Sequence, residues 1–480
     1  MHPSRQAYVE EAKEDTGIDL ADVPLDRDYD MPSATAGIAP ERASAILSQF
    51  DRKRRAAAIA VPTDDGRVRA RLREMGEPIT LFGEGPGDRR DRLRQLLTIE
   101  SEMKAEEDGE DEDELLDARI EIAKFSLPRA KKRMEIQKIE KDIPLRTHIK
   151  FRQGVKERLK DFELQGSQMA AERPVSIVRI SPNGELVAAG NWGGGIKLLG
   201  IPDLEIKKSL RGHTDRVGGI SWAPGATIEG SNVSPGSVNL ASGGAEGKVH
   251  LWNLEQDTPS LPSGIPPIGK YVASASEDTT WRLWDVETTT ELLLQEGHSR
   301  GVFCLSFNGD GSLLASAGMD SIGRIWDLRT GRTVMILDGH IKPIYALDWS
   351  TDGHRVLSGS GDGWVKCWDV RKVASTGAVG AHRSVVSDLR WFKGMDAESL
   401  PENDEKGAVK PRKAGTFFVS SGFDKDVKIF SADDWALVQS LSGHTGNVHS
   451  CDVGADGKWI VSGGYDRTVK LWGRNNGEGV

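Results

Sequence analysis

Serine, histidine and acidic residues recur at fixed spacings in the C-terminal part of the chain, and these are the residue types of a hydrolytic triad. His298, Ser316 and Asp320 form one such set, and Trp326 follows the acid by six residues. A hydroxyl nucleophile, an imidazole base and a carboxylate that orients the base would support acyl transfer. Two further sets repeat the pattern: His340, Ser358, Asp362 and Trp368, and His444, Ser462, Asp466 and Trp472. An enzyme needs only one triad, so we predict that these quartets are structural and that no residue is catalytic.

The spacing between the sets is itself regular. The Gly-His or Ala-His pairs at His298, His340 and His382 are 42 residues apart, and Trp326 and Trp368 each follow a histidine by 28 residues. A period of about 40–45 residues that begins with Gly-His and ends with Trp-Asp is the WD-repeat signature. The pattern therefore predicts a β-propeller, in which each repeat supplies one four-stranded antiparallel blade.

The propeller fold explains why Trp, Ser, His and an acid recur together in each repeat. A buried indole, hydroxyl, imidazole and carboxylate must each find a hydrogen-bond partner, and within one blade they can satisfy one another. The same grid fits seven times, loosely the first time, at Gly193, Glu246, Asp278, Asp320, Asp362, Asp424 and Asp466. We therefore predict an all-β seven-bladed WD-repeat propeller over residues 162–480, with a mostly α-helical, partly disordered N-terminal arm.

Two places depart from a regular ring. Trp252 and Trp284 are only 32 residues apart, and residues 258–267 contain no Gly-His pair and no apolar strand. We therefore expect a shortened third blade that lacks its first strand. Trp472 lies close to Val480, so we expect residues of about 162–172 to supply the outer strand of the last blade and close the ring, which removes exposed sheet edges.

The N-terminal part divides by composition. Residues 1–66 have few large apolar side chains, which predicts a disordered tail. Residues 100–117 hold eleven acids and one lysine, which indicates a solvated acidic linker, and residues 118–161 read as a basic helical segment. The candidate RNA-proximal patch in that segment comprises Lys150, Arg152, Lys156, Arg158 and Lys160. These bases could approach phosphates, or form a solvated helix face or a protein contact.

Bulk composition excludes several classes of protein. The net charge of −10 argues against a general nucleic-acid binder. The three widely spaced cysteines provide no disulfide framework and favour a reducing compartment. We find no apolar run long enough for a membrane helix. The repeat histidines fall in separate blades without clustered ligand spacing, so we expect no metal and no cofactor.

Residues 67–99 carry a distinctive pattern that favours two short helices. The first helix should end at Gly76, because Pro78 prevents its continuation, and the second should span residues 88–97. The stretch Val68 to Glu84, which ends in Gly-Glu-Pro-Ile-Thr-Leu-Phe-Gly-Glu, resembles the splicing factor motif, as does Arg89 to Arg94. Followed by a seven-bladed ring, it is similar to the WD-repeat pre-mRNA processing factors of the U4/U6 small nuclear ribonucleoprotein.

The resemblance implies a non-catalytic scaffold in the nucleus, in the U4/U6 particle and in the U4/U6.U5 tri-snRNP. The implied partners are other U4/U6 proteins, a spliceosomal cyclophilin and U4/U6 small nuclear RNA. The implied partner-binding residues are Leu81, Phe82, Gly83, Glu84 and Arg89, although these could instead pack the two helices together. An alternative is a substrate adaptor of a cullin-type ubiquitin ligase, suggested by Trp-Asp-x-Arg at Trp326 and Trp368.

Overall fold

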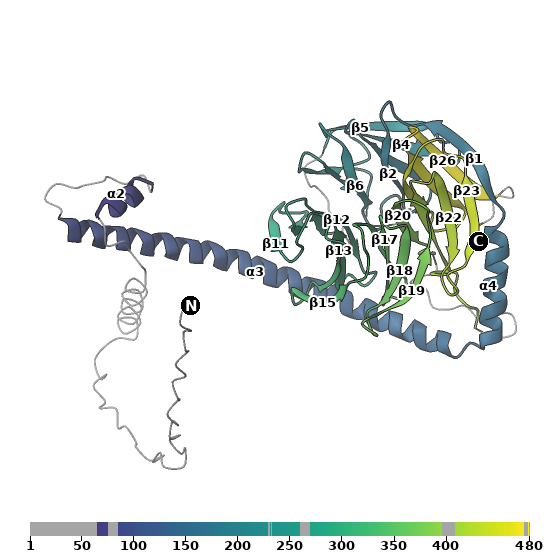
Figure 1. The fold of residues 1–480 in the computed structure, drawn as a ribbon, viewed down its shortest axis with the longest axis horizontal. Helices are drawn as coiled ribbons and strands as arrows, with labels where there is room; N and C mark the ends of the chain where they lie inside the picture. Colours follow the sequence, from purple (N-terminus) through teal and green to yellow (C-terminus); the bar gives the residue numbers. More distant parts are fainter. Residues whose placement is uncertain are drawn as a thin grey trace, which may run out of the picture. The chain divides into compact units, whose positions relative to one another are not determined.

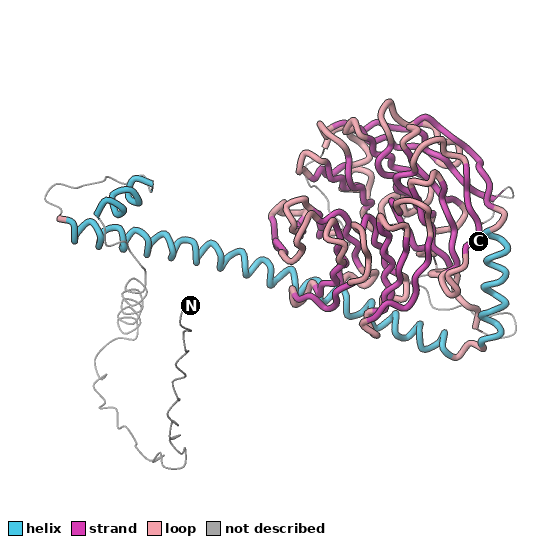
Figure 2. The backbone as a smooth tube through the Cα atoms, in the orientation of Figure 1, coloured by secondary structure: helices cyan, strands magenta, loops and turns pink. Residues whose placement is uncertain are grey.

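The computed structural model describes residues 65–74, 85–228, 231, 233–259, 269–395, 409–474 and 479. The chain splits into two compact units, Met1–Asp108 and Gly109–Val480. Figure 2 shows that the strands, in magenta, all follow the helices, in cyan, along the chain. Nearly all of the expected disordered tail, residues 1–66, lies outside the described residues, and Asp65 and Gly66 belong to the first described helix.

The first unit contains helix α2 (Asp65–Glu74) and the start of helix α3 (Pro86–Lys141). Pro86 suits the first helical position because that residue's N–H would have no partner within the helix. Val68 and Leu72 are four residues apart on one face of α2, and both pack against Leu93 of α3. Two short apolar faces therefore bury each other.

Helix α3 is longer than the sequence predicts. The segment 100–117, expected to be a linker, and the second motif helix, expected to end at residue 97, both lie inside α3. Glu, Met, Lys and Leu have high helix propensity, and a helix that continues from both sides needs no new nucleation. Repulsion between the acidic side chains is therefore too weak to interrupt the helix in this segment.

The expected basic segment, residues 118–161, consists of the last part of α3 and of helix α4 (Leu145–Leu159). Pro144 lies between the two helices, where its ring blocks helix continuation from the preceding residues. Among the described residues, no helix is both long and apolar enough to cross a bilayer.

The second unit is a ring of seven antiparallel sheets, as predicted (Figure 1). Blade 1 contains β2 (Val175–Ile180), β3 (Leu186–Asn191), β4 (Gly195–Gly200) and β5 (Ile206–Arg211). Blade 2 contains β6 (Val217–Trp222), β7 (Leu240–Gly244) and β8 (Val249–Trp252). Blade 3 contains β9 (Tyr271–Ala275), β10 (Trp281–Asp285) and β11 (Glu291–Gln295). Blades 4 and 5 contain β12 (Val302–Phe307), β13 (Leu313–Gly318), β14 (Gly323–Asp327) and β15 (Arg332–Leu337); and β16 (Ile344–Trp349), β17 (Arg355–Ser360), β18 (Trp364–Asp369) and β19 (Ala374–Gly380). Blades 6 and 7 contain β20 (Val386–Trp391), β21 (Phe417–Gly422), β22 (Asp426–Ser431) and β23 (Leu437–Ser442); and β24 (Val448–Val453), β25 (Trp459–Gly464), β26 (Thr468–Arg474) and β1 (Phe162–Met169).

The ring closes as the sequence predicts. Strand β1 pairs antiparallel with β26, from Phe162 opposite Arg474 to Met169 opposite Thr468. Residues from before the first blade thus complete the last one, and the sheet edge of β26 is covered.

The short spacing between Trp252 and Trp284 affects two blades rather than one. Ser274 on β9 aligns with Ser316 on β13, so β9 takes the place of a second strand, and no first strand of blade 3 is found among the described residues. Trp252 on β8 aligns with Trp326 on β14, and no outer strand follows β8 among the described residues. Blades 2 and 3 therefore each have three described strands.

The hydrophobic core is divided among the junctions between blades. Six clusters of buried apolar side chains each join two neighbouring blades, at every junction except one. Within the described part of the chain, no such cluster joins blade 2 to blade 3. No strand that could supply that core is described between β8 and β9.

Candidate partner-binding surfaces

The predicted quartets assemble inside their blades. In blade 4, His298 Nδ1 lies 2.8 Å from Asp320 Oδ2, and its Nε2 lies 2.7 Å from Ser316 Oγ. The Trp326 indole N–H donates to the same Ser316 oxygen at 2.8 Å. The sets of blades 5 and 7 repeat this arrangement at His340, Ser358, Asp362 and Trp368, and at His444, Ser462, Asp466 and Trp472.

The geometry of the quartets does not favour hydrolysis. Ser316, Ser358 and Ser462 are fully buried, so a substrate has no access to their hydroxyl groups. Each of these hydroxyl oxygens already contacts an indole and an imidazole. The arrangement ties two strands and two loops together through buried polar groups that would otherwise be costly.

We expect Asp362→Ala to destabilise the propeller by about 1–3 kcal/mol, because it removes an acceptor from buried donors. Asp362 Oδ2 lies 3.0 Å from His340 Nδ1, and Oδ1 accepts from the Trp364 N–H at 2.9 Å. Equilibrium denaturation in urea measures the change, with the exposed Asp338→Ala as the control. An unchanged unfolding midpoint for Asp362→Ala would contradict a stabilising role for the quartet.

The quartet histidines also predict a pH dependence. Burial lowers the pKa values of His298 and His340 below 6.5, and their aspartate partners only partly offset this. Since the folded-state pKa is below the unfolded one, unfolding takes up protons as the pH falls below about 6.5. The free energy of unfolding should therefore be lower at pH 5.5 than at pH 7.5. Urea midpoints that are constant over this range would disprove the prediction.

One face of the propeller is covered by α3. The helix contacts the starts or turns of successive blades: Glu121 accepts from Lys270 Nζ and from the Tyr271 hydroxyl, Arg133 pairs with Asp310 at 2.7 Å, Gln137 donates to Asp352 O, and Glu140 pairs with Arg412 at 2.6 Å. Ile122 of α3 also joins the core between blades 3 and 4. Helix α3 therefore supports blade 3, which has three described strands.

Helix α4 continues along the propeller, and Figure 1 shows it beside β23. Val155 and Leu159 are buried in the cluster that joins blades 6 and 7. On the polar side, Arg152 pairs with Asp433 at 3.1 Å, and Lys156 pairs with Asp434. The helix is thus held by both apolar and charged contacts.

The candidate RNA-proximal patch is divided by this docking. Arg152 and Lys156 face the propeller and are half-buried, whereas Lys150, Arg158 and Lys160 are exposed. The five bases were expected to form one patch, but the helix directs two of them toward acids of blade 6. The structure leaves three bases on the outer side of this segment.

The opposite face carries exposed apolar side chains. Connections between second and third strands, and between successive blades, emerge at the ends of the strands away from α3. The exposed residues there are Trp192, Phe303, Met319, Ile341, Tyr345, Trp364 and Tyr465. The rings of Phe303 and Tyr345 stack, with their centroids 5.7 Å apart. The Trp192 ring is tilted against His449 and meets Tyr465 edge to face. We refer to these seven residues as the open-face patch. Exposed aromatic groups of this kind are enriched in protein interfaces, and no sequence signal besides the repeat register would have located them.

One of the predicted contact residues of the N-terminal motif, Arg89, is buried. Arg89 is 5% exposed, and its Nε and Nη2 donate to the two carboxylate oxygens of Asp65, each at 3.0 Å. This bidentate pair joins α2 to α3 and places Arg89 in internal packing. The other four predicted residues, Leu81, Phe82, Gly83 and Glu84, lie outside the described residues.

Comparison with protein families identifies both parts of the chain. The family described as pre-mRNA processing factor 4 (PRP4) like matches residues 68–96. The WD domain, G-beta repeat matches residues 204–253, 263–285, 289–327, 331–369 and 435–473. The two matches fall on the α2–α3 pair and on blades of the ring.

Individual relatives point to the same family as these two matches. The chain is 38% identical over 461 residues to the U4/U6 small nuclear ribonucleoprotein PRP4 of Saccharomyces cerevisiae, covering 90% of this chain and 95% of the relative. It is 36% identical to the PRP4-like protein of Arabidopsis thaliana, covering 90% of this chain and 79% of that protein. The match to U4/U6 small nuclear ribonucleoprotein Prp4 of Pongo abelii is 38% identical and spans 42% of each chain. The chain therefore belongs to the family of U4/U6 small nuclear ribonucleoprotein PRP4 proteins, the splicing factors that join a PRP4-like motif to a WD-repeat propeller.

Proposed function

We propose that this protein is a non-catalytic scaffold subunit of the U4/U6 particle, and of the U4/U6.U5 tri-snRNP, in pre-mRNA splicing in the nucleus. One observation carries the proposal: the PRP4-like motif and the propeller occur together in a chain that aligns over nine-tenths of its length with a U4/U6 protein. The buried serines of the quartets support a role in binding rather than in catalysis.

The arrangement of surfaces suggests how the protein binds its partners. Helices α3 and α4 contact one face of the ring, and the open-face patch, on the opposite face, is proposed to contact partner proteins. In the motif, Arg89 positions α2 against α3, and the segment Leu81 to Glu84 between them is proposed to contact a spliceosomal cyclophilin or another U4/U6 protein. Arg89 thereby acts through the packing of the motif and not by touching a partner.

The ubiquitin-ligase adaptor has less support. Arg329, the arginine of one Trp-Asp-x-Arg sequence, donates to Asp327 of its own blade at 2.9 and 3.0 Å. That contact gives this arginine a structural role within the turn. The family relationship does not favour the adaptor either.

The proposed function is tested by affinity purification of the tagged full-length chain from nuclear extract, with RNA sequencing and mass spectrometry. We expect U4 and U6 RNAs, U4/U6 proteins and a cyclophilin. Phe82→Ala should reduce recovery of the cyclophilin, whereas Asp338→Ala on the propeller should not. Recovery of cullin-ligase subunits without U4 and U6 RNAs would reject the splicing role.

Direct RNA contact is a separate prediction. If Lys150, Arg158 and Lys160 approach phosphates, replacing all three by Glu should lower ultraviolet crosslinking to U4/U6 RNA several-fold and reduce its salt dependence. The matched control replaces three exposed lysines of α3: Lys131, Lys132 and Lys138. Equal crosslinking by both variants and the wild-type chain would show that the three bases of α4 do not bind RNA.

A further inference from the structure

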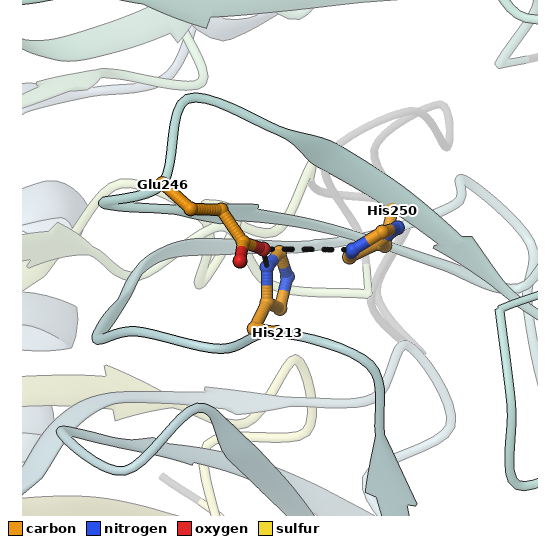
Figure 3. Close-up of side chains that lie close together, drawn as sticks. All are labelled: His213, Glu246 and His250. Atoms are coloured by element: carbon orange, nitrogen blue, oxygen red, sulfur yellow. Dashed lines mark hydrogen bonds and ion pairs between the residues drawn. The ribbon is translucent and has the colours of Figure 1, made fainter.

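Blade 2 contains a cluster of side chains that the proposed function does not use. His213, on the connection between β5 and β6, meets Glu246 and His250 of the β7–β8 hairpin. One ligand atom from each residue lies within 4.8 Å of the other two. Figure 3 shows the Glu246 carboxylate facing both imidazole rings. His213 Nδ1 lies 2.6 Å from Glu246 Oε1, and His250 Nε2 lies 3.6 Å from the same oxygen.

This cluster departs from the quartets of the other blades at two positions. Where blade 2 has Glu246, blades 3 to 7 have aspartate, which is one methylene shorter. Where blade 2 has His250, the other blades have a lysine or arginine two residues before the tryptophan slot: Lys197, Arg282, Arg324, Lys366, Lys428 and Lys470. A permanent cation at that position repels a metal ion, whereas an imidazole can coordinate one. Blade 2 therefore has a ligand set that the other six blades lack.

We propose that His213, Glu246 and His250 form a binding site for Zn²⁺. Two imidazole nitrogens and one carboxylate oxygen are ligands that zinc prefers, and a solvent molecule commonly fills the fourth position. With zinc–ligand bonds of about 2.0–2.1 Å, tetrahedral ligand atoms lie about 3.3 Å apart. The 3.6 Å separation between His250 and Glu246 is already close to this value. The shorter contact of His213 with Glu246 must open by about 0.7 Å, which a side-chain rotation supplies.

The surroundings orient the three ligands. Thr214 holds the other oxygen of Glu246 through its backbone N–H, at 2.9 Å, and through its hydroxyl group. Ser242 Oγ lies 2.7 Å from His213 Nε2, so it accepts that N–H once Nδ1 coordinates zinc. Such outer contacts fix the ring orientation of metal-bound histidines. The side chain of His213 is fully buried, whereas those of Glu246 and His250 are 12% and 22% exposed, which leaves a route for the ion.

The location suggests what the ion would do. Blade 2 has no described outer strand after β8, and no described core cluster joins it to blade 3. An ion bound by His213 and by the β7–β8 hairpin would crosslink the loop that enters the blade to its last described strand. Zinc would thus stabilise the weakest sector of the ring, as α3 does for blade 3.

The repeat histidines, which fall in separate blades, predicted no metal site. His213 and His250 belong to the same blade, and the long loop between β6 and β7 separates them in sequence. The blade brings the β5–β6 connection beside the β7–β8 turn, so residues 33 and 37 positions apart become neighbours.

The test is zinc binding by the purified full-length chain, with zinc chloride alone as the probe. Equilibrium dialysis followed by elemental analysis should give one zinc ion per wild-type chain. Because an ion that binds only the folded state raises its stability, excess zinc should also raise the melting temperature of the wild-type chain. His250→Lys, which installs the residue type of blades 1, 5, 6 and 7, should weaken zinc binding at least tenfold and abolish that rise.

Two further variants keep the outcome decisive. Glu246→Asp introduces the acid that blades 3 to 7 have and moves the carboxylate oxygen away from the two imidazoles, so it should also weaken zinc binding. This variant gives a result even if His250→Lys fails to fold. His148→Lys, on α4, removes a histidine outside the cluster and should leave zinc binding unchanged. No zinc on the wild-type chain, or full zinc binding by both His250→Lys and Glu246→Asp, would overturn the proposal. These measurements are independent of splicing partners, so they do not depend on the proposed function.

Discussion

Asp388→Ala is expected to destabilise the propeller by about 3–5 kcal/mol, the cost of removing one partner of a buried ion pair. Asp388 Oδ2 accepts from Arg179 Nη1 at 2.8 Å, from Ser450 Oγ at 2.6 Å and from the Cys451 N–H at 3.3 Å. These donors belong to blades 1 and 7, whereas Asp388 belongs to blade 6. One carboxylate therefore joins three blades beside the ring closure.

The charge of Asp388 is maintained by its neighbours. Burial raises the pKa of this carboxyl group. The guanidinium groups of Arg179 and Arg390 lower the pKa by more than burial raises it, so the net shift is downward. Removal of the carboxylate leaves the Arg179 charge without this partner. Urea denaturation of Asp388→Ala measures the loss, and the exposed turn residue Asp203→Ala serves as a matched control, expected within about 0.5 kcal/mol of wild type. A loss below about 1 kcal/mol for Asp388→Ala would show that the network contributes little to closure.

Phe162→Ala is expected to cost about 3–5 kcal/mol, because it opens a cavity where the helical segment enters the ring. Phe162 is 1% exposed and packs in the cluster that contains Leu159 of α4, Phe417 of blade 6 and Trp472 of blade 7. It is also the first residue of β1, which closes the ring. The substitution should therefore loosen both the docking of α4 and the pairing of β1.

The measurement combines stability with hydrogen exchange. Urea denaturation should show the full loss for Phe162→Ala, and amide exchange should increase in β1 and β26 before the other blades. Gln168→Ala, at an exposed position of the same strand, should change neither quantity by more than a small amount. If exchange in β1 and β26 stays at the wild-type rate, Phe162 does not control ring closure.

Together, these two substitutions address how the helical segment and the propeller depend on each other. Helix α3 contacts blades 3 to 6, α4 packs on blades 6 and 7, and β1 completes blade 7. Loss of these contacts should therefore lower the stability of the ring as well as of the helices. The open-face patch lies at the other ends of the strands, away from these contacts.

The sequence by itself determined the features that recur at short, fixed spacing. The 42-residue period predicted seven blades, and the quartet around His340 could be assigned because each blade places its four residues at the same register. Closure by β1 followed from the same count of strands. The shortened spacing before Trp284 likewise predicted a shortened blade 3, in which three strands are described.

Only the tertiary structure decided which side chains meet across blades, because such contacts have no repeating spacing. Arg179 and Asp388 are 209 residues apart, and Arg133 lies 219 residues from Asp352. Arg89 became an internal residue through Asp65, and Arg152 turned toward blade 6, for the same reason. Within blade 2, the tertiary structure likewise decided that His213 meets Glu246 and His250, which are 33 and 37 positions away in the sequence. A periodic pattern specifies the backbone of the ring through local register, whereas charge pairing and ligand geometry depend on which surfaces the closed ring brings together.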